Sequence, residues 1–231
     1  MEFPRKKPFR LWASIAYRIY RLGKTLAPRA TLKFVLNAHH FFEHLSWLAI
    51  THSFGEQAYD FPSLKRMFRW IPEGARIVDV GCGAGRVAIE ASKYGSVVGI
   101  DLDDAFLETD SVEFRVTDAL DLKGHFDVAI LSHFLEHLDE PETFLRNVPA
   151  DILIIEVPNF DADARNKFRL KLGLPFYTDA DHVREYTFEA LESQLQRTGW
   201  SITDSIVTGA ITVTAHRQGL TITRKPKKGS G

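Results

Sequence analysis

Apolar positions from residue 76 onward fall into short runs separated by segments with helical spacing. Several runs, such as DVAIL and ILIIEV, are apolar throughout, which is typical of parallel strands buried on both faces. Residues 140–148 and 187–198 repeat their apolar positions at helical intervals. The pattern predicts helices in those two segments and strands at 76–80, 96–101, 112–117, 126–131 and 151–157.

The C-terminal part of this region changes to strict alternation. Residues 200–208 and 210–217 each alternate apolar and polar positions, and they join at Thr208-Gly209. Two alternating runs joined by such a turn predict a β-hairpin. We therefore expect an α/β fold with a Rossmann-like, mostly parallel sheet of seven strands that ends in an antiparallel hairpin.

The N-terminal third is helical in pattern. Phe9, Trp12, Ile15 and Ile19 share one face of a predicted helix over 9–26, and a second helix is predicted over 31–50. A shorter amphipathic piece, SLKRMFRWI, leads into the first strand. The predicted organisation is a helical extension or cap at 1–72, the α/β domain at 73–217 and a basic tail at 218–231.

The first strand ends in a turn with three alternate glycines, Gly81, Gly83 and Gly85, and a helix-compatible segment follows at once. Strand, glycine turn and helix form the start of a nucleotide-binding βαβ unit. Asp79 precedes the turn, and its carboxylate would repel a pyrophosphate but attract an ammonium or sulfonium group. Asp101, at the end of the next strand, can accept ribose hydroxyls. These residues together indicate a cationic nucleoside ligand.

The motifs DVGCGAG, GIDL, VTDAL and FDVAILSHFLEHL, in this order, resemble class I S-adenosylmethionine-dependent methyltransferases over about residues 74–216. The resemblance implies that S-adenosylmethionine is the cofactor and S-adenosylhomocysteine the product. It places the methionine end of the cofactor at Asp79 and Gly81, the ribose at Asp101, and the adenine at Leu102, Asp118 and Ala119. The full set of expected cofactor-binding residues is Asp79, Gly81, Cys82, Gly83, Gly85, Asp101, Leu102, Asp118, Ala119 and Ser132.

Histidines near the fourth strand are the candidate catalytic groups. An amine or hydroxyl acceptor must lose a proton when it is methylated, and imidazole is the natural base. His133 and His137 follow the fourth strand, and His182 lies in a long predicted loop at 159–186, for part of which an amphipathic helix, NKFRLKLGL, is the alternative interpretation. The candidate catalytic residues are therefore His137, His182 and His133, and the candidate substrate-binding residues are His40, Tyr177, Arg184 and Tyr186.

His133, Glu136 and His137 would share one helical face, so a metal site is an alternative interpretation. The segment resembles the Glu-x-x-Glu-His of ubiquinone-pathway O-methyltransferases and of small-RNA 3′-terminal 2′-O-methyltransferases. The RNA enzymes add a later histidine in a setting similar to His182. This chain has His133 where those families have the first Glu, which argues against a magnesium-type site. We expect no metal.

Charge is distributed unevenly. Residues 1–33 carry nine Lys or Arg against one acid, and residues 217–231 carry five against none, whereas the formal net charge is only −1. The single cysteine excludes an internal disulfide. No apolar run is long enough to cross a bilayer, so we expect a cytoplasmic protein. The basic N-terminal helix could contact a membrane surface peripherally, although we favour a lid that packs over the cofactor site.

These observations predict a methyltransferase that acts on an oxygen or nitrogen of a small or lipid-linked metabolite. The alternatives are a metal-dependent RNA 2′-O-methyltransferase and a non-catalytic regulatory protein that binds the cofactor. Nucleic acid is the less favoured partner, because the core is acidic and no RNA-binding module is recognisable. The oligomeric state does not follow from the sequence.

Overall fold

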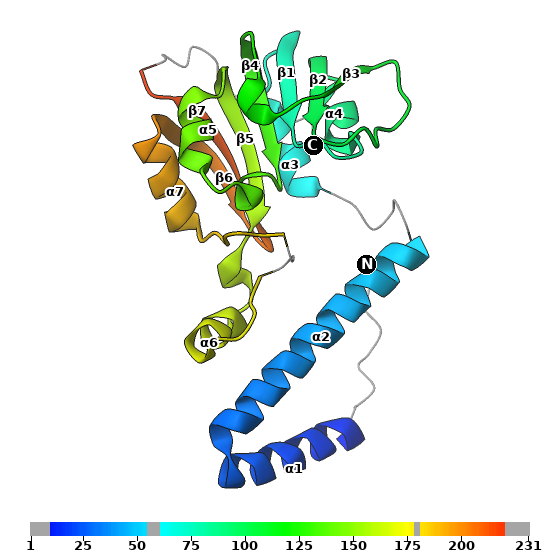
Figure 1. Cartoon of the computed structure of the whole chain (residues 1–231), viewed down its shortest axis with the longest axis vertical. Helices are drawn as coiled ribbons and strands as arrows, with labels where there is room; N and C mark the ends of the chain where they lie inside the picture. The colour runs from blue at the N-terminus through cyan, green and yellow to red at the C-terminus, as the bar shows by residue number, and fades with distance from the viewer. Residues whose placement is uncertain (1–9, 55–60, 178–180, 220–231) are drawn as a thin grey trace. The chain divides into compact units, whose positions relative to one another are not determined.

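The computed structural model describes residues 10–54, 61–177 and 181–219 (Figure 1). The chain divides into two compact units. The sheet unit comprises residues 60–163 and 177–231, and the helical unit comprises residues 1–59 and 164–176. The division at residue 59 differs from the predicted boundary at residue 72, and it also assigns an internal segment to the helical unit. The predicted basic tail lies almost wholly outside the described residues.

The sheet unit contains a seven-stranded sheet in the order β3-β2-β1-β4-β5-β7-β6. The first five strands are parallel, and β7 pairs antiparallel with both β5 and β6. The predicted α/β class and its C-terminal hairpin are confirmed. The strands are β1 (Ala75–Val80), β2 (Gly95–Asp101), β3 (Val112–Val116), β4 (Phe126–Ser132), β5 (Ala150–Pro158), β6 (Trp200–Val207) and β7 (Ala210–Arg217).

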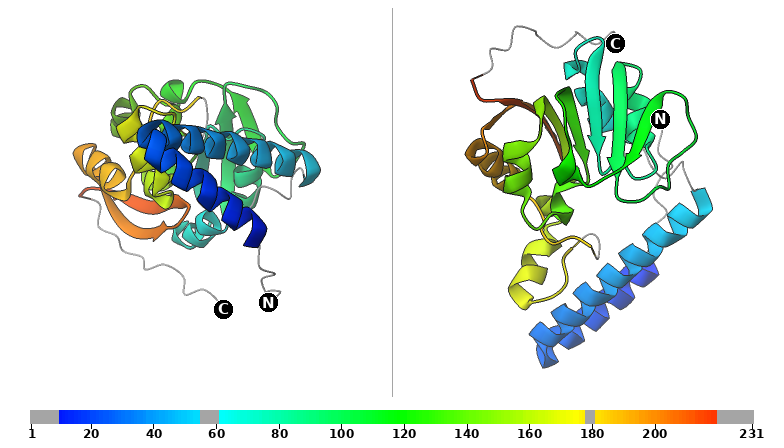
Figure 2. Two further views of the ribbon diagram at one scale, coloured as in Figure 1. Left: turned by 90° about the horizontal axis from the view of Figure 1, so that it is seen from below. Right: turned by 45° about the horizontal axis from the view of Figure 1, so that its top comes forward.

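Helices cover both faces of this sheet, which gives three layers (Figure 2). Successive strand residues point to opposite faces: Ile77 packs with α3 and α4, and Val78 packs with α5 and α7. Two apolar cores result, one on each side. The helices are α3 (Pro62–Met67), α4 (Arg86–Ala91), α5 (Pro141–Asn147) and α7 (Phe188–Arg197), with 3-10 turns η2 (Phe68–Trp70), η3 (Ala119–Asp121), η4 (Leu135–His137) and η5 (Phe160–Ala162).

The helical unit consists of α1 (Arg10–Leu26), α2 (Pro28–Phe54) and α6 (Arg165–Leu172). Pro28 opens α2, a position where its missing N–H costs nothing. Both predicted N-terminal helices are present. α6 lies within the stretch predicted as a long loop, and it packs against α2 rather than against the sheet. Among the described residues, no helix combines the length and hydropathy needed to cross a membrane.

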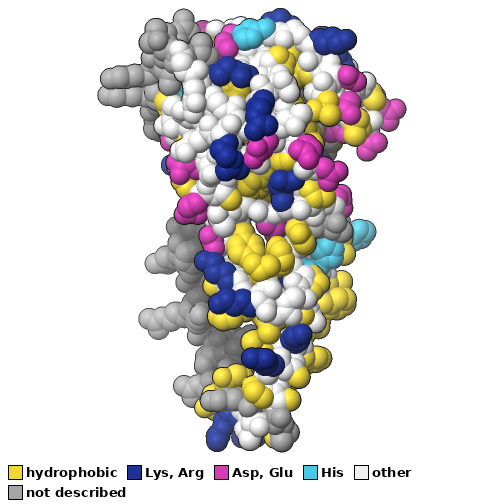
Figure 3. Space-filling model, turned by 60° about the vertical axis from the view of Figure 1, so that its left-hand side comes forward, with side chains coloured by type: hydrophobic (Ala, Val, Ile, Leu, Met, Phe, Trp, Pro, Cys, Tyr) yellow, Lys and Arg dark blue, Asp and Glu magenta, His cyan; other side chains and the backbone are white. Residues whose placement is uncertain are grey.

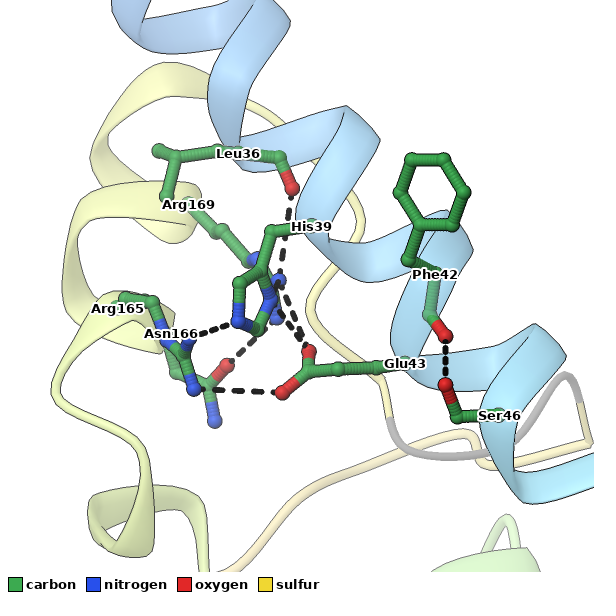
Figure 4. A network of polar contacts seen from close by, with 8 residues as sticks. All are labelled: Leu36, His39, Phe42, Glu43, Ser46, Arg165, Asn166 and Arg169. Carbon is green, nitrogen blue, oxygen red and sulfur yellow. Dashed lines mark hydrogen bonds and ion pairs between the residues drawn. The ribbon is translucent and has the colours of Figure 1, made fainter. Parts of the chain in front are cut away.

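A polar network joins α6 to α2 (Figure 4). Glu43 on α2 forms ion pairs with Arg165 at 3.3 Å and Arg169 at 3.4 Å, and His39 lies 2.7 Å from the same carboxylate. Arg169 also donates to the carbonyl of Leu36, and its side chain is only 4% exposed. A guanidinium this buried is held by paired acceptors, so the network fixes α6 on α2.

Candidate active site

The glycine turn after β1 depends on backbone geometry that other residues avoid. Gly81 has φ +66° and Gly85 has φ +85°. A Cβ on Gly81 would lie 2.6 Å from the ring of Phe134, and one on Gly85 would lie 2.2 Å from the ring of Phe114. Only glycine allows the turn to adopt these angles and to pack this closely. Gly85 is also the residue from which α4 begins.

Asp101 ends β2 and contacts this turn. Its Oδ2 accepts the backbone N–H of Gly83 at 2.7 Å. Its Oδ1 accepts the backbone N–H of Leu102 at 2.8 Å and of Asp103 at 3.2 Å. These bonds fix the carboxylate at the C-terminal end of the parallel strands, where ligands of open α/β sheets bind.

Asp79 is almost completely buried, and its Oδ2 has no hydrogen-bond partner in the described part of the chain. Desolvation by burial raises the pKa of Asp79 to about 8, and the nearby Asp101 adds to this rise. A buried carboxyl with an unpaired oxygen favours a cationic partner, because a cation offsets the cost of ionising it. This is the property that the sequence assigned to Asp79.

A cavity of about 520 Å³ opens beside the turn. Its volume lies in the range typical of small-molecule sites. Five predicted cofactor residues line it, namely Gly81, Asp101, Leu102, Asp118 and Ala119, together with His133 and His137. Sequence reasoning missed the remaining lining residues, Ile100, Thr117, Leu120, Phe134, Leu138, Phe144 and Asp181.

The other predicted cofactor residues do not line this cavity. Gly83 and Gly85 shape the turn, and Ser132 is the last residue of β4. Burial raises the pKa of Cys82 to about 12, so its thiol stays protonated at neutral pH. Its Sγ lies 3.7 Å from the carbonyl oxygen of Gly83. Gly83, Gly85 and Cys82 therefore contribute to the site through the backbone of the turn, and Asp79, which is buried, does not line the cavity either.

Asp118 combines two roles that the sequence could not separate. Its Oδ1 accepts the backbone N–H of Leu120 at 2.8 Å and so caps the 3-10 turn η3. The same residue lines the cavity. A carboxylate oxygen has more than one acceptor site, so the cap leaves Asp118 able to accept a further hydrogen bond there.

His133 is held between two carboxylates. Its Nδ1 lies 3.3 Å from Glu136, and its Nε2 lies 3.6 Å from Glu156 on β5. Desolvation lowers the pKa of His133, but the hydrogen bonds and charges of Glu136 and Glu156 outweigh it and raise that pKa to about 9. His133 also has φ +50°, which is uncommon for a non-glycine residue.

Glu136 also belongs to a second cluster with His137 and His182, in which one ligand atom of each residue lies within 4.8 Å of the others. The rings of His137 and His182 meet edge to face at 4.8 Å, and Nδ1 of His182 pairs with Glu185 at 3.1 Å. The predicted arrangement of His133, Glu136 and His137 on one helical face is wrong, because Leu135–His137 is a 3-10 turn and His133 pairs with Glu136 instead.

This cluster has the donors of a metal site. The two oxygens of Glu136 are buried, their described charged partner is His133 at 3.3 Å, and two imidazoles stand beside them. One carboxylate with two imidazoles suits a first-row transition metal or zinc better than magnesium. Binding a metal would require Glu136 to exchange its ion pair with His133. The expectation of no metal therefore stays a prediction.

Three of the predicted substrate-binding residues, Tyr177, Arg184 and Tyr186, do not line the cavity. Arg184 donates to the carbonyls of Leu138 and Asp139, both at 2.8 Å. Tyr186 is buried, and its hydroxyl donates to Gln194 at 3.0 Å. Neither of these side chains lines the cavity, and nor does Tyr177, which is partly exposed.

His40, the remaining predicted substrate residue, lies on α2 in the helical unit. Burial and the nearby Arg169 lower its pKa. Its predicted contact with substrate stays a prediction.

Comparison with known families adds independent information at this point. The family described as "Methyltransferase domain" matches residues 54–205. The chain belongs to this family. Its motifs around Asp79 and Asp101 are those of class I S-adenosylmethionine-dependent methyltransferases, as the sequence predicted.

Two curated relatives of the chain carry the same name. The ubiquinone biosynthesis O-methyltransferase of Xanthomonas axonopodis pv. citri is 32% identical over 89 residues, covering 32% of this chain and 37% of that protein. The mitochondrial enzyme of the same name from Homo sapiens is 28% identical over 169 residues, covering 62% of this chain and 44% of that protein. The chain thus spans less than half the length of these relatives.

Solved structures confirm the fold. The small RNA methyltransferase HEN1 matches with a TM-score of 0.56 at 16% identity, covering 69% of this chain and 25% of that one. Magnesium protoporphyrin IX methyltransferase from Synechocystis PCC 6803 with bound S-adenosylhomocysteine matches with a TM-score of 0.52 at 16% identity. That match covers 94% of this chain and 90% of the other, so it extends into the helical unit of the methyltransferase.

Proposed function

We propose that the methyltransferase transfers the methyl group of S-adenosylmethionine to an oxygen or nitrogen of a small or lipid-linked metabolite. The observation that carries this proposal is a single cavity lined by Asp101, Asp118 and His137. The two carboxylates that we assign to the nucleoside and the candidate base thus line the same cavity. The O-methyltransferase name of the curated relatives supports an oxygen acceptor.

S-adenosylmethionine supplies an electrophilic methyl group on a sulfonium, so the protein must mainly align the acceptor with it. In this proposal Asp101, which lines the cavity, holds the ribose of the cofactor, and Asp79, which is buried and is not among the lining residues, holds the ammonium group. The acceptor proton then needs a base within reach of the same cavity. His137 is exposed and lines that cavity, which makes it the base that we propose.

The other two candidate histidines are less suited to this role. Both ring nitrogens of His133 face carboxylates, so neither is free to take a proton from an acceptor. The side chain of His182 is only 5% exposed and is not among the cavity residues. His182 instead packs edge to face against His137 and positions its ring.

A screen with methyl-labelled S-adenosylmethionine tests this proposal. Aqueous metabolites, lipid extracts and RNA from the source organism are offered separately, and the labelled fraction identifies the acceptor class. We expect label in the aqueous or lipid fraction, with kcat reduced about 10²–10⁴-fold in His137→Gln. The control is His125→Gln, a surface histidine paired with Asp151. Label only in RNA, or full activity of His137→Gln, would contradict the proposal.

A second candidate, metal-dependent oxygen methylation with RNA as one possible acceptor, is favoured by the cluster of Glu136, His137 and His182. These residues would hold the ion, which would polarise an acceptor hydroxyl and lower its pKa. Metal analysis of the purified protein and assays with and without chelator separate the two candidates. Full activity in chelator removes the metal-dependent one, and loss of activity that zinc or manganese restores would establish it.

A further inference from the structure

The helical unit exposes an unusual amount of apolar surface. On α1, Ile15, Ile19 and Leu22 form one helical stripe and are 38%, 58% and 65% exposed. On α2, Phe34, Phe41 and Leu45 form a second stripe and are 72%, 62% and 49% exposed. Soluble proteins seldom leave such stripes open, and large apolar patches mark interaction sites. We call these six residues the apolar stripes.

The same unit is strongly basic. Its described residues include ten Lys or Arg and a single acid, Glu43, which is already paired with Arg165 and Arg169. Arg18 and Arg21 lie on α1 and Lys33 lies on α2, and these three make no ion pair with any described residue. Hydrophobic and basic side chains occupy the helical part of the face drawn in Figure 3.

We propose that the helical unit docks the methyltransferase on the surface of an anionic lipid bilayer. The apolar stripes would enter the interface between headgroups and acyl chains, and Arg18, Arg21 and Lys33 would meet lipid phosphates. A helix with Phe, Leu or Ile on one side and Lys or Arg on the other lies in a membrane interface in this way. This proposal does not depend on which methyl acceptor binds in the cavity.

Other occupants fit the surface less well. A second copy of the unit would bring two strongly positive surfaces together, which like-charge repulsion opposes. The sheet unit is acidic, but among its described cavity-lining residues the large exposed hydrophobics are Leu102 and Leu120 alone. If the helical unit instead acted as a lid over the cavity, these two leucines would leave most of the apolar stripes uncovered. An RNA would satisfy the basic residues but would leave aliphatic Ile15, Ile19 and Leu22 in water.

Vesicle sedimentation with the full chain tests this proposal. One set of vesicles is pure phosphatidylcholine, and the other contains equal parts of phosphatidylcholine and phosphatidylglycerol. We expect the protein to sediment with the anionic vesicles and to stay in solution with the neutral ones. Raising the salt concentration should weaken the binding, because exposed charges are screened.

Two pairs of variants locate the surface. Phe34→Ser with Phe41→Ser should lower the vesicle partition coefficient by more than about tenfold, whereas Val207→Ser, an exposed apolar residue of the sheet unit, should not change it. Arg21→Gln with Lys33→Gln should lower it roughly fivefold per charge removed. The matched control is Arg66→Gln with Lys123→Gln, two exposed cations of the sheet unit. Circular dichroism verifies that each variant is folded.

Three results would overturn the proposal. The first is a full chain that ignores anionic vesicles at low salt. The second is unchanged vesicle binding in both helical-unit variants, because the contact would then lie elsewhere. The third applies when wild type binds no vesicles. In that case the Phe34→Ser, Phe41→Ser variant binds S-adenosylhomocysteine more weakly, or self-associates less, than wild type does. That result would assign the apolar stripes to a lid or to a dimer. Methyl transfer in detergent-free buffer is measured separately, so failure of the proposed function is distinguishable from failure of the docking surface.

Discussion

Asp101 accepts the backbone N–H of Gly83 at 2.7 Å, which joins the end of β2 to the glycine turn after β1. This bond joins an acidic side chain that lines the cavity to the tight turn whose first glycine, Gly81, lines the same cavity. The turn follows β1 and Asp101 ends β2. The two lie side by side because β1 and β2 are neighbouring strands that pair up to Val80 and Ile100. The sheet topology therefore brings together the two elements of the candidate cofactor site.

Replacing Asp101 tests the ribose assignment. Asp101→Ala should weaken S-adenosylhomocysteine binding about 10- to 100-fold, because a charge-assisted hydrogen bond contributes roughly 1.5–3 kcal/mol. Isothermal titration calorimetry measures this directly. Asp103→Ala, an exposed acid two residues away, is the control and should bind as wild type does. Equal affinity of the two variants would remove Asp101 from the site.

Ligand binding should depend on pH through Asp79. The pKa of its carboxyl is raised to about 8 in the ligand-free protein, so the group is mostly neutral at pH 7. The ammonium of the ligand favours the ionised form, and binding at pH 7 should therefore release a proton. Affinity for S-adenosylhomocysteine should rise between about pH 6 and 8, by at most about tenfold per pH unit, and then level off. Titrations in buffers of different ionisation enthalpy detect the proton.

The raised pKa of Asp79 also predicts how the stability of the folded protein depends on pH. The folded state binds a proton on Asp79 up to about pH 8, whereas the unfolded chain releases it near pH 3.8. Stability contributed by this proton is thus present below pH 3.8 and is lost as pH rises toward 8. Asp79→Asn should raise the melting temperature of the ligand-free protein at about pH 8 while weakening ligand binding. A variant that melts lower than wild type at that pH would contradict the burial of an unpaired carboxyl.

Gly85 should not tolerate a side chain. Gly85→Ala combines φ +85° with a Cβ 2.2 Å from the ring of Phe114, so we expect a loss of about 1–3 kcal/mol in the free energy of unfolding. Gly209→Ala is a matched control, since nothing lies within 4 Å of its Cβ. Urea denaturation of both variants measures the difference. Similar stability of the two would mean that the turn relaxes without cost.

The sheet could be predicted from sequence because each buried strand is an apolar run of the right length. The runs DVAIL and ILIIEV became β4 and β5 within one residue at most boundaries. The glycine turn was equally predictable, because its positive φ angles favour glycine. Local chemistry determined both features.

Contacts between distant segments were not predictable in this way. Glu156 stood in an apolar run and was treated as part of a strand, yet it pairs with His133. An acid inside an otherwise buried strand was the available signal. An amphipathic helix was one interpretation of residues 166–174, but the sequence did not show that ion pairs with Glu43, more than a hundred residues away, fix α6 on α2. Sequence spacing carries no information about such pairings.

The central claim is that Asp79 and Asp101 together hold S-adenosylmethionine. Titration of S-adenosylhomocysteine and, separately, NAD into wild type and the Asp79→Ala, Asp101→Ala double variant tests it most directly. We predict one S-adenosylhomocysteine site in wild type, no measurable binding in the double variant, and no NAD binding in either. Wild type that binds NAD instead, or a folded double variant that retains wild-type affinity, would contradict it.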